Sequence, residues 1–162
     1  ILVREDRYQE MLDGGVEFGT GHTYGGNPLS AAAGCAVIDY LENNHLVEQV
    51  NQKGEILENL LRGLLERVPM VVDVRGVGLL WGVELATSKE DNIPFPPKNR
   101  VTQKVVAACK RNGLLVYPSS GFVDGVQGDS VLISPPFIIS EKELQELVYL
   151  LEKSLVEVAR EF

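Results

Sequence analysis

The alternation of short strand-like runs with helical runs is the feature that most constrains what this chain can fold into. From Met70 onwards, short apolar runs bounded by Gly, Pro or Asn alternate with segments whose apolar residues recur at helical spacing. This order predicts a small α/β or α+β domain, with helices covering one face of a sheet of three or four strands. The predicted strands are 70–74, 79–85, 114–117 and 131–134, and the predicted helices are 98–111 and a last helix that begins at Ser140.

The first part of the chain is organised around a glycine-rich stretch, 16–26, that leads into a helix start. Asn27 is a favourable N-cap and Pro28 is well placed as the first helical residue, so we expect a helix from Pro28 to about Asn43. Its first turns consist of small residues, which favours close packing against a sheet or another helix. The remaining expectations are the end of a buried strand at 1–3, a short polar helix or turn at 4–12, and a helix from 45 to about 68 that Pro69 ends.

Composition excludes several classes of function. A formal net charge of −8 and an isoelectric point near 4.8 argue against a nucleic-acid surface, which needs clustered Lys and Arg. No apolar run approaches the roughly 18–20 residues that span a bilayer.

The two cysteines, Cys35 and Cys109, are far apart, and we interpret both as buried small apolar residues in a reducing compartment. The chain opens on Ile1 without the features of a signal peptide, and its start in mid-strand predicts a piece of a longer protein.

Generic catalytic and binding motifs are not matched. The Gly76-x-Gly78 pair resembles the start of a dinucleotide fingerprint, but the next glycine is Gly82 and the segment that follows predicts a strand rather than a helix. The two histidines, His22 and His45, have no partner at metal-ligand spacing, so no metal site is expected. No serine lies in a G-x-S-x-G turn.

The stretch 19–28 carries a different signal. Backbone N–H groups and two threonine hydroxyls precede a helix N-terminus, where the helix dipole favours an anion. The residues alone leave two interpretations open, a phosphate or carboxylate site and an ordinary glycine loop.

Four segments together resemble the class III aminotransferases, which are pyridoxal-phosphate enzymes of fold type I. Residues 21–33, Gly-His-Thr-Tyr-Gly-Gly-Asn-Pro-Leu-Ser-Ala-Ala-Ala, are similar to that family's G-(F/H)-T-Y-S-G-(H/N)-P-x-x-x-A-A segment. Residues 74–85 resemble its R-G-x-G-L-x-x-G-x-E-L hairpin, 113–116 the strand that follows, and 133–139 its P-P-(L/F)-I-I segment. The four matches occur in the family's order and span the chain.

This resemblance implies an architecture and an activity. The chain corresponds to the C-terminal part of a fold-type-I enzyme: the end of the large domain at 1–44, a linking helix at 45–69, and a small C-terminal α/β domain at 70–162. The implied full-length protein is a cytoplasmic homodimer with its active site at the subunit interface. It binds pyridoxal 5'-phosphate and moves an amino group between an amine or amino acid and a keto acid.

The resemblance also assigns site residues. Thr23 is the position whose hydroxyl reaches the cofactor phosphate of the neighbouring subunit, and the adjacent His22 contributes backbone or packing. Tyr117 stands where many relatives carry an arginine for a second substrate carboxylate, and a phenol cannot pair with a carboxylate in bidentate fashion. The following loop, 118–130, is open to two interpretations, a determinant of substrate selectivity and a solvated connection.

The family's Schiff-base lysine and the acid that pairs with the pyridinium nitrogen are expected upstream of Ile1. We therefore expect no catalytic residue in this chain, no catalytic role for its seven lysines, and no activity of the chain alone. Two alternatives remain open: another class III enzyme (an aminomutase, decarboxylase or lyase) and a non-catalytic binding or dimerisation module.

Overall fold

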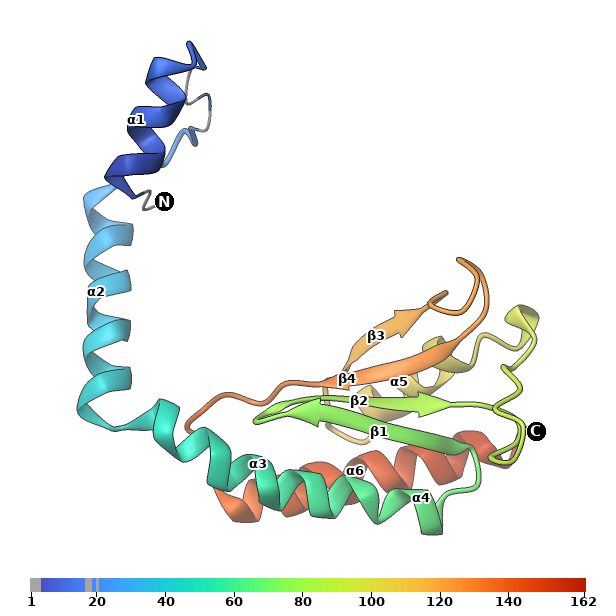
Figure 1. Ribbon diagram of the computed structural model, residues 1–162. Coiled ribbons are helices and arrows are strands. Elements are labelled where there is room, and N and C mark those ends of the chain that lie inside the picture. The colour runs from blue at the N-terminus through green and yellow to red at the C-terminus, as the bar shows by residue number, and fades with distance from the viewer. Residues whose placement is uncertain (1–3, 17–18, 20) are drawn as a thin grey trace. The chain divides into compact units, whose positions relative to one another are not determined.

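The computed structural model describes residues 4–16, 19 and 21–162, and its contacts divide the chain into two compact units, Ile1–Tyr40 and Leu41–Phe162 (Figure 1). The strand end expected at 1–3 and part of the glycine-rich stretch lie outside the described residues. In the described part of the chain, no helix has both the length and the apolar character that crossing a membrane requires.

The first unit holds the helix α1 (Glu5–Asp13) and most of α2 (Pro28–Asn43). The predicted start of α2 is confirmed, because Asn27 Oδ1 accepts the backbone N–H of Ser30 at 3.1 Å and so caps the first turn. No residue of α2 is buried within the described chain, although the helix carries several large apolar side chains.

The second unit is built on a four-stranded sheet. Its strands are β1 (Val71–Val77), β2 (Leu80–Leu85), β3 (Tyr117–Ser120) and β4 (Asp129–Ile133), in the spatial order β1-β2-β4-β3. Every neighbouring pair is antiparallel. Of the two classes that the sequence left open for this domain, the antiparallel pairing corresponds to α+β.

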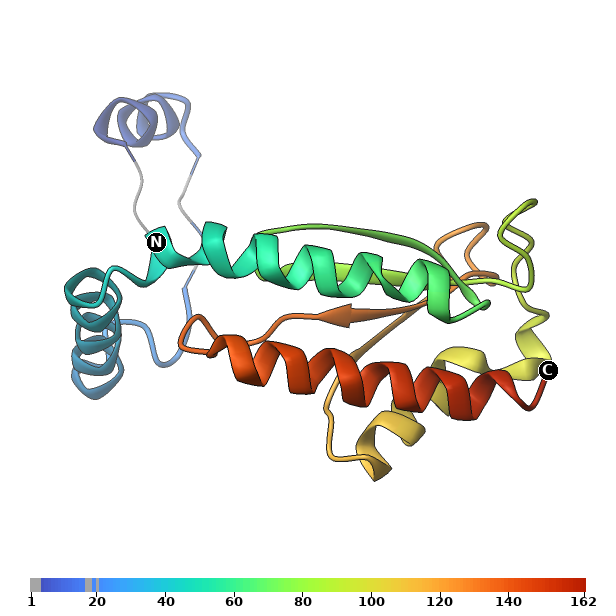
Figure 2. The same ribbon diagram turned by 90° about the horizontal axis from the view of Figure 1, so that it is seen from below.

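Helices cover one face of this sheet, as Figure 2 shows from below. They are α3 (Leu46–Arg62), α4 (Leu64–Arg67), α5 (Val101–Arg111) and α6 (Glu141–Ala159), with a short 3-10 turn η1 (Pro97–Asn99) before α5. The core lies between the two layers. Its fully buried members include Leu57 and Leu61 from α3, Val83 from β2, and Leu144 and Leu151 from α6.

The expectations for 114–130 need correction. Residues 114–116 are not a strand; they form an extended link after α5, and β3 begins only at Tyr117, where β4 lies opposite. The loop expected over 118–130 is correspondingly shorter, because both of its ends pair in the sheet and only 121–128 connects them. Pro118 fits β3 because this strand lies at the edge of the sheet, where one side needs no backbone donors.

The turn between β1 and β2 is pressed against α3. Gly78 takes a left-handed φ of 54°, and its carbonyl accepts the Trp81 indole N–H at 2.7 Å. A Cβ atom on Gly54 of α3 would lie 2.7 Å from the Gly78 Cα. The R-G-V-G run of the sequence is therefore explained by packing: the turn and the helix meet with no room for side chains.

The predicted capping box of the last helix is confirmed, and it gives a first testable prediction. The Glu143 N–H donates to Ser140 Oγ at 3.3 Å, while the Ser140 N–H donates to Glu143 Oε2 at 2.8 Å, and the latter bond lowers the Glu143 pKa. Ser140→Ala should lower the free energy of unfolding by about 1 kcal/mol. The Glu143 pKa is lower in the folded state than in the unfolded state. The ionised Glu143 carboxylate therefore adds to the free energy of unfolding at neutral pH, and this stabilisation is lost as the pH falls through the folded-state pKa. Urea unfolding of the wild type, Ser140→Ala and Glu143→Gln at neutral and at acidic pH measures both effects. A Glu143→Gln variant that loses as much stability on acidification as the wild type would contradict the role of Glu143.

Candidate functional site

Two successive hydrogen-bonded turns bring the glycine loop to the start of α2. The Gly25 N–H donates to the His22 carbonyl at 2.8 Å, and the Asn27 N–H donates to the Tyr24 carbonyl at 3.1 Å. Gly26 follows with a left-handed φ of 71°, which favours glycine at this position. The sequence thus folds locally into a tight loop that ends at the N-terminus of α2.

His22 and Thr23 lie side by side in this loop, and both side chains are exposed. Among the described residues, the Thr23 hydroxyl has no hydrogen-bond partner, and no Asp or Glu lies between 21 and 38. A neutral hydroxyl and a helix N-terminus, with no carboxylate in the segment 21–38, form a donor set that suits a phosphate group. The residues present therefore fit the phosphate of pyridoxal phosphate.

Tyr117 belongs to the second unit, where it is the first residue of β3. It pairs with Leu132 of β4, which pairs with Gly82 of β2, which pairs with Arg75 of β1, so these four residues form one row across the sheet. The Tyr117 side chain is 67% exposed and is free to contact a ligand. Arg75 is not free in the same way, because its guanidinium pairs with Asp73 and with Glu84.

The connection 121–128 is held by its own hydrogen bonds. Asp124 Oδ1 accepts the N–H groups of Gln127 at 2.6 Å and Val126 at 2.9 Å, and these bonds lower the Asp124 pKa. Gly121, Gly125 and Gly128 all take left-handed φ angles. The loop is an ordered hairpin turn, and the structure leaves its role in substrate selectivity a prediction.

All seven lysines lie on helices or connecting loops of the second unit, and none belongs to the glycine loop. Lys53 Nζ donates to the Phe137 carbonyl at 2.6 Å, Lys89 Nζ to the Leu65 carbonyl, and Lys104 pairs with Glu161 at 2.7 Å. These contacts are structural.

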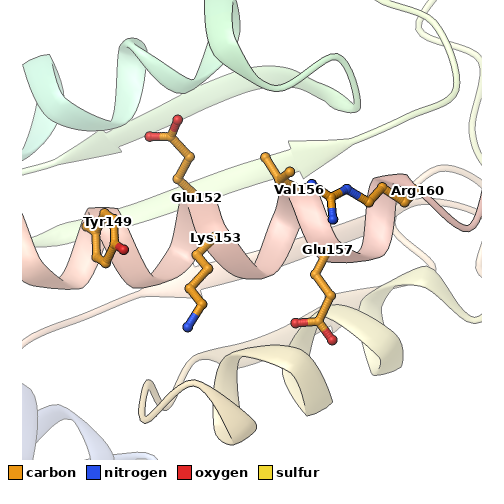
Figure 3. A pocket seen from close by; sticks show the side chains of 6 residues that line it. All are labelled: Tyr149, Glu152, Lys153, Val156, Glu157 and Arg160. Atoms are coloured by element: carbon orange, nitrogen blue, oxygen red, sulfur yellow. The ribbon is translucent and has the colours of Figure 1, made fainter.

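Two of the depressions on the second unit contrast in their lining. One runs along the outer face of α6 (Figure 3) and is lined by Tyr149, Glu152, Lys153, Val156, Glu157 and Arg160. Its carboxylates are already paired, Glu152 with Arg67 at 3.0 Å and Glu157 with Arg111 at 2.5 Å. Exposed ion pairs of this kind are typical of a solvated helix face.

The other depression is an apolar pocket beside Tyr117, and sequence reasoning missed it. Its volume is about 260 Å³, and it lies between the link before β3, the end of β4 and α6. Leu115, which is 83% exposed, lies at its rim with Tyr117 and Pro135. No local motif could reveal it, because three segments far apart in the sequence form it.

Comparison with known proteins identifies the family. The family described as "Aminotransferase class-III" matches residues 1–155. The uncharacterised aminotransferase YodT of Bacillus subtilis is 36% identical over 87% of this chain, and the gamma aminobutyrate transaminase 1, mitochondrial, of Solanum lycopersicum is 32% identical over 88%. A crystal structure of a transaminase from the marine bacterium Virgibacillus superposes with a TM-score of 0.87 at 28% identity, over 98% of this chain and 35% of that one.

The chain spans a quarter to a third of the length of these relatives, 32% of YodT and 26% of the Solanum transaminase. The match nevertheless runs through both units, from the segment before the glycine loop into α6. This chain therefore belongs to the class III aminotransferases, a family of pyridoxal-phosphate-dependent enzymes.

Proposed function

We propose that the full-length protein is a pyridoxal-phosphate-dependent transaminase that moves an amino group between an amine or amino acid and a keto acid. The observation that carries this proposal is the family match over residues 1–155. In this proposal, 1–44 complete the cofactor-binding large domain, 45–69 link it to the small domain, and 70–162 form that small domain. The cytoplasmic location stays a prediction, and the names of two relatives place those proteins in mitochondria and chloroplasts.

Thr23 is the proposed phosphate ligand in this chain. Its hydroxyl is exposed and lies in the segment 21–38, which contains no Asp or Glu, so it can donate to a phosphate oxygen without changing protonation state. His22 is proposed to support this position through its backbone, because its carbonyl already accepts the Gly25 N–H and shapes the turn around Thr23. Pyridoxal phosphate, when bound, supplies an electron sink for the amino-group transfer.

Homodimerisation with the active site at the subunit interface is part of the proposal. The first unit leaves large apolar side chains of α2 exposed, among them Leu29, Val37 and Ile38. Large apolar side chains exposed on several sides of a helix are typical of a helix that other elements cover. In the full-length dimer we expect the remainder of the large domain and the partner subunit to cover it.

The isolated 162-residue chain should form no covalent adduct with pyridoxal phosphate at one specific lysine. The reason is that all seven lysines lie on helices or loops of the second unit, outside the glycine loop, whereas the resemblance implies a Schiff-base lysine in none of these positions. Incubation with the cofactor, borohydride reduction and peptide mapping measure this, and scattered low-level labelling is the expected result. Stoichiometric labelling of a single lysine would contradict the assignment.

The function itself is tested with the full-length protein, a panel of amino donors and two or more keto acids. Amino transfer to a keto acid supports the proposal. The specific alternative is elimination, because one relative, 30% identical over 99% of this chain, is named an (R)-1-hydroxy-2-aminoethylphosphonate ammonia-lyase. Release of ammonia without amination of any keto acid would favour that alternative and contradict the transaminase.

A further inference from the structure

One Asn-Gly pair occurs in the chain, Asn112-Gly113 at the end of α5. Each of the other seven asparagines precedes a residue that carries a side chain. Because glycine has no Cβ, its backbone nitrogen is the least hindered one from which to attack the side chain of a preceding asparagine. Asparagine is a thermally labile residue, and this reaction is one cause. The sequence therefore makes Asn112 the first candidate in the chain for deamidation.

The reaction needs no reagent other than water. The Gly113 backbone nitrogen loses its proton and attacks Cγ of Asn112, so that a new C–N bond closes a five-membered succinimide ring. The bond from Cγ to Nδ2 breaks, and the side-chain nitrogen leaves with that proton as ammonia. Water then opens the ring at one of its two carbonyls, which leaves either aspartate or isoaspartate at this position. Both products carry a negative charge where asparagine had none.

The fold holds the attacking nitrogen in place. Asn112 is the C-cap of α5, with φ −82° and ψ 0°, and the Gly113 N–H donates to the Lys110 carbonyl at 3.2 Å. Gly113 itself is exposed, takes a left-handed φ of 90° and has open space around it, so water reaches it. The nitrogen is therefore accessible to water but is engaged in the last turn of the helix.

The side chain that would be attacked is held by α6. Nδ2 of Asn112 donates to Ser154 Oγ at 3.0 Å and to Glu157 Oε2 at 3.4 Å. Ring closure requires the Asn112 side chain to turn to the Gly113 nitrogen, so the bonds to α6 must break first. The contact between α5 and α6 thus keeps the reaction closed in the folded protein.

Aspartate at position 112 would lose its bond to Ser154. Ser154 is fully buried, and its hydroxyl hydrogen is already used, because Oγ donates to the Leu150 carbonyl at 2.7 Å. The Oγ lone pair that accepts the Asn112 amide would then face a carboxylate oxygen, and neither group has a hydrogen to share. A buried acceptor left without its donor destabilises the folded state.

The charge of the product is also unfavourable at this place. Glu157 points from α6 towards the end of α5 (Figure 3), where its carboxylate pairs with Arg111 at 2.5 Å. Hydrogen bonding to the Arg111 guanidinium lowers the pKa of Glu157, and the bond from the Asn112 amide adds to this effect. The ionised Glu157 would face a second carboxylate, at a helix C-terminus whose partial negative charge disfavours an anion as well.

We propose that Asn112 is a deamidation site that the α5–α6 contact keeps closed, and that its conversion to aspartate or isoaspartate loosens this contact. Opening of the last turn of α5 exposes the site, and the product no longer fits the place that Asn112 occupied. The modification is therefore one-way. This inference concerns the second unit alone and does not rest on the proposed transaminase function.

The first test follows the reaction itself in the full-length protein. Samples are kept at mildly alkaline pH, either folded or in urea, and peptide mass mapping measures conversion at each asparagine of this chain. In urea, Asn112 should convert ahead of the other seven asparagines. In the folded protein its conversion should be about tenfold slower or more, because the last turn of α5 must open first. Equal rates in the two samples, or no preference for Asn112 in urea, would overturn the inference.

The second test measures the consequence through Asn112→Asp, which has the charge of the product. Amide hydrogen exchange over 108–114 should become about tenfold faster than in the wild type, because the bond to Ser154 is lost. Asn99→Asp is the matched control. It adds the same charge at another half-buried asparagine of the second unit, whose side chain makes no hydrogen bond among the described residues. Exchange over 108–114 should stay unchanged in this control.

Glu157→Gln tests the charge contribution in a double-mutant cycle. In the Asn112→Asp background it should slow the exchange again, because it removes one of two facing carboxylates. In the wild-type background it should speed the exchange, because it breaks the ion pair with Arg111. Wild-type exchange in Asn112→Asp, or the same effect of Glu157→Gln in both backgrounds, would overturn the proposed loosening of the α5–α6 contact.

Discussion

Gly54→Ala should lower the free energy of unfolding of the second unit by about 2 kcal/mol. A Cβ atom at this position would lie 2.7 Å from both the Cα and the carbonyl oxygen of Gly78. Backbone atoms at that distance cannot rotate away, so α3 and the β1–β2 turn must separate, and overpacking of this kind costs typically 1–3 kcal/mol. The gain in helix propensity from glycine to alanine, up to about 1 kcal/mol, offsets only part of that cost.

Gly63→Ala supplies the control for this prediction. Gly63 lies at the end of the same helix with an ordinary φ of −59°, and the nearest atom to an added Cβ is the mobile guanidinium of Arg67. The free energy of unfolding should therefore stay constant or rise slightly. Urea unfolding followed through Trp81 fluorescence measures both variants, because this is the single tryptophan and it is 3% exposed in the core of the second unit. Equal stability of the two variants would show that the turn does not pack on α3 as described.

The parts of the fold that could be predicted from the sequence are those determined by local chemistry. The starts of α2 and α6 depend on Asn27 and Ser140, whose side chains cap N–H groups three residues away, so a short window of sequence contains the whole signal. The β1–β2 hairpin is likewise local, although β1 extends further than expected because the turn tightens at Gly78.

The parts that could not be predicted depend on residues distant in the sequence. β3 is an exposed edge strand whose position is determined by its pairing with β4, and its apolar pattern is weak. The start of α5 shows the same dependence, since Asp129 of β4 accepts both the N–H and the hydroxyl of Thr102, at 2.9 and 2.6 Å. A helix capped by a carboxylate 27 residues away gives no local signal, and the predicted helix began three residues too early.

The residues of the candidate site also differ in whether a local motif or only the folded chain reveals them. Thr23 and His22 lie in one contiguous motif, so a resemblance over thirteen residues was enough to single them out. The pocket beside Tyr117 combines residues from 114–117, 132–139 and α6, and only the folded chain brings them together. Sequence reasoning therefore found the residue at the rim of the pocket and missed the apolar floor below it.

Thr23→Val in the full-length enzyme should weaken pyridoxal-phosphate binding by about tenfold to a hundredfold. If the Thr23 hydroxyl donates to the cofactor phosphate across the dimer, valine removes one charge-assisted hydrogen bond and keeps the shape of the side chain. Hydrogen bonds to charged groups contribute about 1.5–3 kcal/mol, which corresponds to that range of affinity. Equilibrium dialysis or cofactor absorbance during titration of the apoenzyme measures the dissociation constant directly.

Thr23→Ser separates a role in phosphate binding from a role in folding. Serine keeps the hydroxyl and loses one methyl group, so cofactor affinity should stay within a few-fold of the wild type. Because Thr23 is exposed in the loop, neither substitution should change the unfolding of the second unit. Turnover at saturating cofactor should also fall much less than affinity, since the phosphate anchors the ring and takes no part in proton transfer. Equal losses of affinity in Val and Ser variants would mean that loop packing matters and the hydroxyl does not. Full affinity in both would remove Thr23 from the cofactor site, whatever the fold of the chain.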